Sequence, residues 1–518
     1  MSVCVPTHVP QCTETVRTMV KQIIKIAEKP ELGRHVLANV DLGEWQIALI
    51  ERPLIRGPSQ VTGPVCLGCL KSLTLETATE CTKCGWPMCS DSKCLDDEWH
   101  KAECDWTVTK RKQKVKIKGF DAPHPSYQSI TVIRCLYQKH NNPETWAKLT
   151  CLESHCANRR GGSKYESDKI WIADYLHRFF KLDPTEYPTD EILRVCGIVQ
   201  VNGHEVPLTD PPHVAIYDVG SMLEHSCLPN CSKTFTSDGR LLIRTAGSPV
   251  KNREHLSICY TDPLWGTPQR LAHLADTKFF VCKCPRCSDP TEMGTYFSGV
   301  KCEAEDCMGY FLPNVSPSAS DPFDVSWTCN FCSTVADPNR IEQCLAHVGK
   351  DLAAMNRRDP GQCRLFLDHY VSAGNLHPNH YYFTDVRLNL AQLYGQLEGQ
   401  PLDKLSQEQL SHKRELCLKV LKIADILFPA ECRLRGSLMF ELHAVMAEEA
   451  RRSNQDTNSV VEALLRSKNY LEQAENMLKH EPAEMPEGQM AAQCKKNAVD
   501  LDLLLKKLHD SLGGIAPM

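Results

Sequence analysis

The chain has 518 residues, of which 42% are hydrophobic and 24% charged, and its formal net charge is −5. That length exceeds what one hydrophobic core supports, so we expect about three or four domains. This net charge gives no global electrostatic footprint for nucleic acid, so we expect no direct nucleic-acid binding. No run approaches the roughly 18 apolar residues of a membrane helix, and the first residues lack a signal-peptide pattern, so we expect no membrane association and a cytoplasmic or nuclear protein.

The first predicted strands lie in GRHVLANVDLGEWQIALIERPLI, residues 33–55. Short apolar runs broken by glycine and proline are typical of a strand, a turn and a second strand. A β-rich region therefore opens the chain.

Cysteine is unusually frequent, with 28 residues. Without a secretory signal, such residues are expected to stay reduced or to bind zinc. Residues 66–104 hold eight candidate ligands, which suit two tetrahedral zinc sites. They are Cys66, Cys69, Cys81, Cys84, Cys89, Cys94, His100 and Cys104. Because this segment contains few apolar residues, we expect metal binding to supply its folding free energy.

A basic run and two helices follow. The run KRKQKVKIK, residues 110–118, is interpreted as a solvated face or linker, with a localisation signal or phosphate-contacting patch as the alternative. Residues 129–140 and 168–182 have the pattern of amphipathic helices. In the second helix, one face is predicted to carry Ile170, Ala173, Leu176 and Phe180.

Two further cysteine clusters lie beyond a strand predicted from the alternation of Leu256, Ile258 and Tyr260. Cys282, Cys284 and Cys287 leave a tetrahedral zinc one ligand short, and Cys227 of SMLEHSCLPNC is a candidate for the fourth. A complete set that resembles a zinc ribbon follows, with structural cysteines as the alternative: Cys302, Cys307, Cys329 and Cys332. Between its halves, LPNVSPSASDPFD is predicted to be a loop. Together the clusters predict about four structural zinc ions.

From about residue 338 the composition favours helices. Val386, Leu390, Leu393 and Leu397 have helical spacing, and so do Leu464, Leu471, Ala474 and Leu478. Ser459 and Glu462 are predicted to form a capping box at the start of the second of these helices. No clean 34-residue repeat is visible, although stacked helices of this kind form concave surfaces that hold peptides.

The order of these motifs resembles the SET and MYND family of protein-lysine methyltransferases, in the branch abundant in arthropods, over nearly the whole chain. The resemblance implies an α+β multidomain fold: a β-rich SET domain with an inserted MYND zinc finger, a cysteine-rich post-SET segment, a zinc-ribbon-like segment and an all-α C-terminal domain similar to tetratricopeptide repeats. The implied boundaries are an N-terminal extension at 1–29, SET at 30–64, MYND at 65–105, insert helices and the remaining SET strands at 106–263, post-SET at 264–290, the ribbon-like segment at 291–337 and the helical domain at 338–518.

In that family the MYND ligands interleave. The resemblance therefore implies one zinc bound by Cys66, Cys69, Cys89 and Cys94, and another bound by Cys81, Cys84, His100 and Cys104. One departure is visible, since four residues separate Cys89 from Cys94 where the family usually has three.

The resemblance also implies methyl transfer from S-adenosylmethionine (SAM) to a lysine amine. Such an in-line displacement needs positioned reactants, excluded water and a neutral amine. The family's catalytic tyrosine maps to Tyr260, and its cofactor contacts map to Gly33, Arg34, His35, Glu224, His225 and Phe280. The alternative for Tyr260 and Phe280 is ordinary packing, and for His225 a buried histidine bonded to backbone.

Four positions depart from the family pattern. His35 replaces a glycine of the first motif, and Glu224 replaces an asparagine that donates to the cofactor. Val199 replaces a channel aromatic. Lys278 replaces a channel tyrosine, and its ammonium group would repel an incoming charged lysine.

Two functions therefore stay open. The first is a SAM-dependent protein-lysine methyltransferase, acting on histone or other proteins in transcription or chromatin regulation. The second is a catalytically degenerate adaptor that binds partners, such as proline-containing corepressor peptides, through the finger and the helical domain. In either case we expect a monomer.

Overall fold

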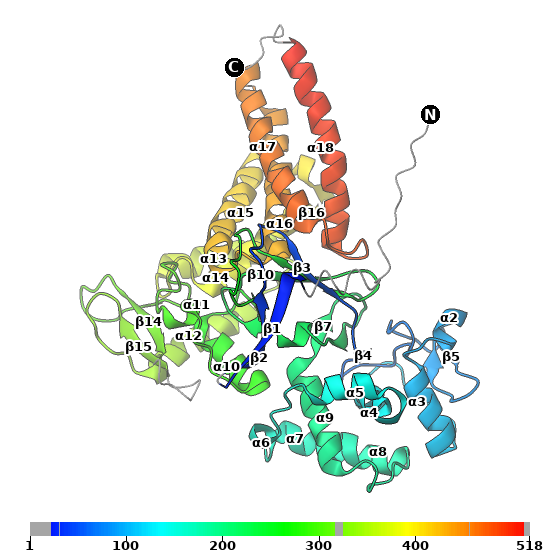
Figure 1. The fold of residues 1–518 in the computed structure, drawn as a ribbon. Helices are drawn as coiled ribbons and strands as arrows, with labels where there is room; N and C mark the ends of the chain where they lie inside the picture. The colour runs from blue at the N-terminus through cyan, green and yellow to red at the C-terminus, as the bar shows by residue number, and fades with distance from the viewer. Residues whose placement is uncertain (1–21, 31, 316–324, 455, 512–518) are drawn as a thin grey trace, which may run out of the picture.

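The computed structural model describes residues 22–30, 32–315, 325–454 and 456–511. Its lobes meet at a β-rich centre (Figure 1). One lobe holds the segment from α2 (Ser92–Leu95) to α9 (Thr189–Asn202), and another holds the short sheet of β14 (Tyr310–Val315) and β15 (Val325–Cys329). A stalk of long helices rises from the centre and ends the described chain. The structure is thus a mixed helix and sheet fold, as expected at this coarse level.

The predicted strand-turn-strand is confirmed. β2 (Gly33–Ala38) pairs antiparallel with β1 (Ile24–Lys29), in a hairpin that crosses the predicted boundary at residue 30. β3 (Ile47–Glu51) forms the edge of a sheet with β11 (Leu241–Thr245) and β10 (Cys231–Phe235). A second three-stranded sheet contains β4 (Ile55–Pro58), β8 (His213–Ile216) and β7 (His204–Val206).

A short pair of parallel strands joins two segments that are distant in the sequence. β9 (Glu224–His225) pairs with β12 (Ser257–Ile258). Leu256 and Ile258 are buried as the alternation predicts, and Tyr260 lies just beyond the end of β12. The pair brings the stretch SMLEHSCLPNC beside Tyr260, although 36 positions separate Glu224 from Tyr260 in the chain.

The cysteine-rich segment shares a large apolar core with the insert helices, contrary to the expectation that it has too few apolar residues. Leu67, Trp86 and Met88 are fully buried against Tyr127 and Ile130. The segment contains α2, α3 (Lys101–Trp106), β5 (Thr79–Glu80) and β6 (Pro87–Met88), followed by η1 (Thr107–Arg111). Its neighbours are η2 (Pro125–Ser129), α4 (Ile130–Asn141) and α5 (Pro143–Thr150). Apolar packing therefore contributes to its stability together with any bound metal.

The first two residues of the basic run, Lys110 and Arg111, contact other side chains, whereas the lysines that follow are exposed to solvent. Lys110 forms an ion pair with Glu186 at 3.2 Å, and the Arg111 guanidinium lies 3.6 Å from the centre of the Phe179 ring. Val115 is buried, while the lysines that follow Arg111 are exposed. This arrangement agrees with a solvated face, and a role in localisation stays a prediction.

The helix predicted at 168–182 forms, but its buried face is shifted. It runs through α7 (Ser163–Asp168), η3 (Lys169–Ala173) and α8 (Asp174–Phe179), preceded by α6 (Cys156–Arg159). In η3 the Asp174 N–H bonds the Lys169 carbonyl, five residues back. This π turn breaks the 3.6-residue period, so Ile170 is 56% exposed and Ile172 is buried in its place. Ala173, Leu176 and Phe180 are buried as predicted.

The C-terminal part is helical apart from a small hairpin. The helices are α12 (Pro338–Ala354), α13 (Pro360–Ala373), α14 (Tyr381–Leu393), α15 (Gln407–Leu427), α16 (Cys432–Arg452), α17 (Thr457–Leu478) and α18 (Pro486–Ser511), with a short η5 (Leu402–Lys404). The hairpin joins β16 (Gln396–Leu397) and β17 (Gln400–Pro401). Leu397 therefore lies outside the helix predicted for it, because α14 ends at Leu393 and Gly395 follows with φ of +86°. On α17 the apolar stripe is buried as predicted.

The predicted capping box on α17 is wrong. Asp456 is the N-cap, and its side chain accepts the backbone N–H of Ser459. The helix thus begins two residues before Ser459, which places Ser459 inside its first turn.

The predicted loop between the halves of the ribbon-like cluster is also corrected at its start. Residues 312–315 belong to β14, which pairs with β15, and β13 (Val300–Lys301) completes this sheet. Residues 316–324 lie outside the described residues.

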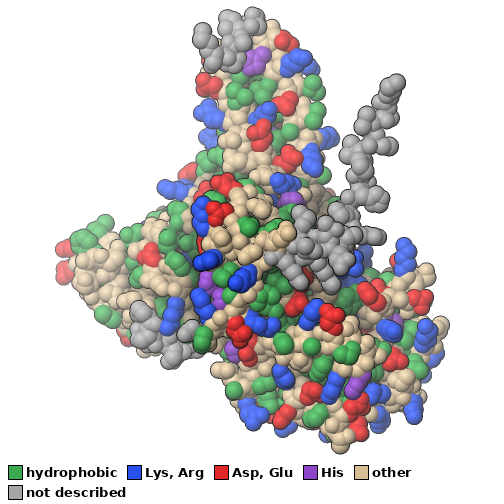
Figure 2. All heavy atoms as spheres, in the orientation of Figure 1, with side chains coloured by type: hydrophobic (Ala, Val, Ile, Leu, Met, Phe, Trp, Pro, Cys, Tyr) green, Lys and Arg blue, Asp and Glu red, His purple; other side chains and the backbone are tan. Residues whose placement is uncertain are grey.

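Within the described ranges, no helix combines the length and the apolar character that crossing a membrane requires. On the face shown in Figure 2, positive and negative side chains are interspersed along the helical stalk.

Candidate functional site

Four groups of candidate ligands converge as the sequence predicts. In each group the ligand atoms lie within 4.8 Å of one another. The groups are Cys66, Cys69, Cys89 and Cys94; Cys81, Cys84, His100 and Cys104; Cys227, Cys282, Cys284 and Cys287; and Cys302, Cys307, Cys329 and Cys332. Four thiol or imidazole ligands at such separations suit tetrahedral zinc, so each group could hold one ion.

In the third group Cys227 lies beside the three later cysteines, as its predicted role of a long-range ligand requires. The sulfur of Cys227 lies 4.0 Å from that of Cys282 and 3.5 Å from that of Cys287. Cys227 follows β9, whereas the other three follow α10 (Thr267–Lys278) and reach into α11 (Pro285–Ser288). A metal here would tie the parallel strand pair to the segment after α10.

A buried carboxylate orients the histidine of the second group. The His100 Nδ1 lies 3.1 Å from the Glu103 carboxylate, and Nε2 lies 3.5 Å from the Cys84 sulfur. Arg134 donates to both oxygens of Glu103, at 2.7 and 3.1 Å. Such a carboxylate–histidine pair fixes the ring for metal binding through its other nitrogen. Sequence reasoning missed this pair, and its one local signal is Glu103 three residues after His100.

Three of the predicted cofactor and catalytic residues meet at the end of the parallel strand pair. The His225 Nδ1 accepts the backbone N–H of Tyr260 at 3.0 Å. The His225 ring centre lies 5.1 Å from that of Tyr260 and 5.9 Å from that of Phe280. Burial lowers the pKa of His225 to about 4, so its imidazole is neutral at physiological pH. Phe280 is 36% exposed, which leaves its ring available to a ligand.

Glu224 has a partner that the sequence did not reveal. The Nδ1 of His255 bonds its carboxylate, and the His255 ring stacks on His35 at 4.6 Å between ring centres. His35 is fully buried and its Nε2 has no partner among the described residues. His255 is 31 residues from Glu224, and no spacing rule links the two.

The first motif divides between two roles. Gly33 has φ of +67°, a conformation that favours glycine. The Arg34 guanidinium donates to the carbonyl of Cys151 at 2.5 Å and so joins β2 to the insert. Arg34 is therefore engaged with backbone, whereas His35 faces the Glu224–His255 pair.

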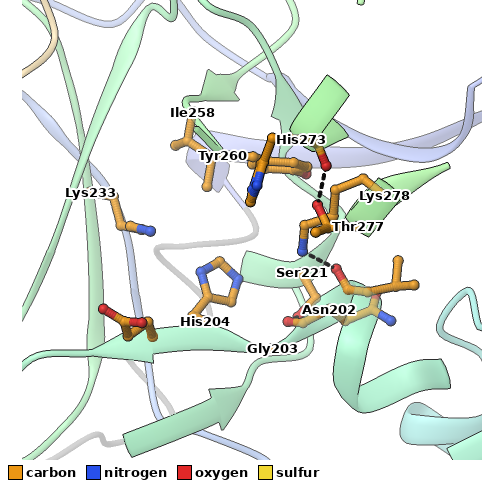
Figure 3. A pocket seen from close by; sticks show the side chains of 12 residues that line it. Asn202, Gly203, His204, Ser221, Lys233, Ile258, Tyr260, His273, Thr277 and Lys278 are labelled. Carbon is orange, nitrogen blue, oxygen red and sulfur yellow. Dashed lines mark hydrogen bonds between the residues drawn. The ribbon is translucent and has the colours of Figure 1, made fainter. Parts of the chain in front are cut away.

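Tyr260 also lines a cavity of about 260 Å³, to which neither His225 nor Phe280 contributes (Figure 3). Its walls come from the end of α9 and β7, from β10 and β12, from η4 (Gly220–Met222), and from α10. The Tyr260 hydroxyl donates to the carbonyl of Leu223. Lys278 lies at the C-terminal end of α10, with its Nζ 5.5 Å from the Tyr260 ring centre and 2.6 Å from the carbonyl oxygen of Val201. Val199 is buried in the apolar core of α9 and does not line the cavity.

The cavity disfavours positive charge. Burial and the neighbouring Lys233 lower the pKa of Lys278 to about 8. Burial also lowers the pKa of Lys233, and lowers that of His204 well below its ordinary value. Burial raises the pKa of the Tyr260 phenol. Sequence reasoning missed Lys233, His204 and His273, because distant elements bring them to the cavity.

The mixed fold, the four ligand groups and the comparisons agree on a class of protein: the chain is similar to SET domain-containing proteins and to lysine methyltransferases of the SMYD family. The SET domain-containing protein SmydA-8, isoform A, of Drosophila melanogaster is 24% identical over 461 residues, which cover 84% of this chain and 94% of the relative. The N-lysine methyltransferase SMYD2 of Homo sapiens is 26% identical over 222 residues, 41% of this chain and 48% of the relative. The histone-lysine N-methyltransferase SMYD3 of Mus musculus is 25% identical over 235 residues, 43% and 52% respectively. No protein-family model matches the chain.

Proposed function

We propose that the chain is a SAM-dependent protein-lysine methyltransferase. The supporting observation is that Tyr260 belongs to two neighbouring groups of residues. Its ring lies 5.1 Å from that of His225, which lies 5.9 Å from that of Phe280, and Tyr260 also lines the 260 Å³ cavity, to which neither His225 nor Phe280 contributes. The His225 and Phe280 side would receive the cofactor, and the cavity would receive the acceptor lysine. Relatives named as lysine methyltransferases support the same reaction.

The proposed layout follows the strands. β2–β4 and β7–β12 would form the SET domain, with β1 as part of its first hairpin. The MYND finger at 65–105 would interrupt it, and the post-SET segment at 264–290, the ribbon-like segment at 291–337 and the helical domain from 338 would follow. The four ligand groups fall in the finger, the post-SET segment and the ribbon-like segment, with Cys227 as the fourth post-SET ligand.

The residues on the proposed cofactor side fit SAM. Phe280 offers a partly exposed ring for an adenine, Glu224 offers a carboxylate acceptor for an amino group, and His35 has a buried nitrogen without a partner among the described residues. SAM would supply an electrophilic methyl group. Tyr260 would orient the acceptor amine, and the surrounding burial would exclude water.

The electrostatics of the cavity favour the neutral amine that methyl transfer needs. The environment that lowers the pKa of Lys278 to about 8 would also lower that of an entering lysine. The same environment makes entry as an ammonium group unfavourable. The acceptor would therefore shed its proton on or before entry.

Calorimetry with SAM on the zinc-loaded chain tests the proposal. We expect binding, and we expect a Tyr260→Phe variant to keep that affinity while losing methyl transfer to a histone or peptide pool. Tyr310→Phe, in the ribbon-like segment, is the matched control and should keep both properties. Absence of binding at millimolar SAM, with zinc content intact, would refute the proposal that the chain is a SAM-dependent methyltransferase.

A second candidate is a non-catalytic adaptor, and the placement of Lys278 favours it. Its ammonium group bonds the Val201 carbonyl beside the Tyr260 ring, where an acceptor would have to lie. In this case the finger and the stacked helices would bind protein partners, including proline-containing corepressor peptides. A role in transcription or chromatin, a cytoplasmic or nuclear location and a monomeric state belong to both candidates as proposals.

A further inference from the structure

The cavity beside Tyr260 is lined by two lysines, and neither forms a hydrogen bond or ion pair with a carboxylate of the described residues. Lys233 from β10 and Lys278 from α10 reach it from opposite sides (Figure 3). His204 and His273 contribute two imidazoles to its walls. Among the lining residues, Glu205 alone bears a carboxylate, and its side chain is exposed to solvent.

Neither ammonium group has an anionic partner within the described chain. Lys278 donates to the uncharged carbonyl of Val201 at 2.6 Å. For the Lys233 ammonium, no hydrogen bond or ion pair is found among the described residues. Glu431 lies near Lys233 and lines a second cavity with it, but no hydrogen bond or ion pair joins the two side chains, and burial raises the pKa of Glu431. Two partly buried lysines therefore line the same cavity, and the charge of Lys233 is one cause of the lowered pKa of Lys278.

We propose that this cavity binds a carboxylate group, carried either by a small free acid or by an acidic residue of a peptide. One carboxylate has two oxygens that accept from several donors, so a single group can bond both Lys233 and Lys278. It would also offset the repulsion between them, which adds to the larger cost of burying each charge.

The volume of the cavity and the type of its hydrogen-bond donors restrict the class of ligand that it can bind. The volume of 260 Å³ is below the roughly 300–1,000 Å³ of pockets that hold drug-sized ligands, so it suits a small acid or one side chain. No arginine lines the cavity, and α10 presents its C-terminal end there, whose dipole opposes a doubly charged anion. A monovalent carboxylate fits these donors better than a phosphate.

The proposal does not depend on SAM. It concerns the acceptor side of Tyr260, whereas the cofactor would contact the His225 and Phe280 side. Failure to bind SAM would leave the carboxylate site intact, and failure to bind a carboxylate would leave the cofactor side intact. The two proposals are therefore tested separately on the same preparation.

Calorimetry on the full zinc-loaded chain provides the first test. The probes are acetate, glutarate, a capped alanine peptide with a central glutamate, and the same peptide with glutamine. We expect the glutamate peptide or a free acid to bind, and the glutamine peptide to bind at least roughly tenfold more weakly. Binding of acetate or glutarate at the peptide's affinity would identify a free acid as the source, and binding of the peptide alone would identify an acidic side chain.

Variants locate the site. Lys233→Met and Lys278→Met should each weaken the carboxylate probe roughly tenfold or more, because each removes one charged hydrogen bond. Lys350→Met, on the exposed surface of α12, removes the same charge elsewhere and should leave the affinity unchanged. Zinc content and circular dichroism check that each variant is folded.

A second measurement needs no substitution. Amine acylation followed by mass spectrometry should label Lys233 and Lys278 more slowly when the carboxylate probe is present, with Lys350 unaffected. Equal binding of the glutamate and glutamine peptides, unchanged labelling, or no binding of any carboxylate at about 10 mM would overturn the proposal.

Discussion

Replacing Glu292 by glutamine is expected to loosen the segment that links Tyr260 to the third ligand group. The Glu292 carboxylate accepts from Arg270 Nη1 at 2.9 Å and from Arg286 Nε at 3.0 Å, and it accepts the Ser298 hydroxyl at 2.5 Å. All three charged side chains are 0% exposed. Both arginines also donate to the carbonyl of Trp265, so the network spans the turn after Tyr260, α10 and α11.

The magnitude follows from the burial of the network. Glutamine keeps the shape but removes the carboxylate charge that pairs with two buried guanidinium groups. Breaking a buried charge pair from one side typically costs about 3–5 kcal/mol. At about 1.4 kcal/mol per factor of ten, the local opening equilibrium should rise by roughly two to three and a half orders of magnitude.

Hydrogen exchange read by mass spectrometry is the suitable assay, because a chain with several cores and metal clusters does not unfold in one step. Peptides from residues 263–298 should lose protection by the factor above in Glu292→Gln. Glu303→Gln is the matched control, since Glu303 pairs with Arg340 at 2.7 Å with both side chains more than half exposed. That change should stay within about 1 kcal/mol. A loss of protection below tenfold in Glu292→Gln would refute the reasoning.

The same network has a defined pH dependence. Burial opposes ionisation of Glu292, but Arg270 and Arg286 outweigh it and hold the pKa of that carboxyl below its usual range. A carboxyl whose pKa is lower in the folded state stabilises above its unfolded pKa, near 4, and this contribution is lost as the pH falls through the folded pKa. Protection of 263–298 should therefore fall below about pH 4 in the wild type, and Glu292→Gln should lack that step.

Glu51→Gln should destabilise the turn before β9 by about 1–3 kcal/mol. The Glu51 side chain accepts three backbone N–H groups of residues 218–220, and the NH₂ group of glutamine would face one of these N–H donors with another donor. Unchanged hydrogen exchange in that turn would contradict this expectation. Lys413→Met should destabilise the helical domain by about 3 kcal/mol. The change removes the ion pair with Glu441 and leaves the carbonyls of Ala391 and Tyr394 without this hydrogen-bond donor. An unchanged midpoint of urea unfolding for these helices would count against the expectation. Metal analysis should find about four zinc ions per chain, and two or fewer would refute the third and fourth groups.

The third ligand group was predictable because a tetrahedral zinc ion needs four ligands, wherever in the chain they lie. Cysteine spacing placed most ligands in pairs, while the division of the eight ligands at 66–104 into two interleaved sets came from the family resemblance. Cys282, Cys284 and Cys287 therefore required a further partner, which pointed to Cys227 although 55 residues separate it from Cys282. No comparable counting rule exists for the residues that support a site.

Side-chain networks and helix irregularities lay beyond the sequence. Glu224 looks like an isolated acid in its motif, and only the parallel pairing of β9 with β12 brings His255 to it. Lys233 and Lys278 belong to different elements and meet only at the cavity. Ile170 was misplaced because a π turn shifts the phase of its helix, a feature that apolar periodicity averages out.

Lys278 connects the two proposals, and one substitution separates its effects. Removing its charge in Lys278→Met should weaken a carboxylate probe, because one donor is lost, and should favour an incoming lysine, because one repulsive charge is lost. The two effects have opposite signs, so a general loss of structure cannot imitate them. Calorimetry with the carboxylate and methyl transfer to a lysine peptide, run on one preparation, measure both. If both activities fall together, Lys278 acts through its bond to the Val201 carbonyl, as an anchor of α10 on α9, and its charge does not select the ligand.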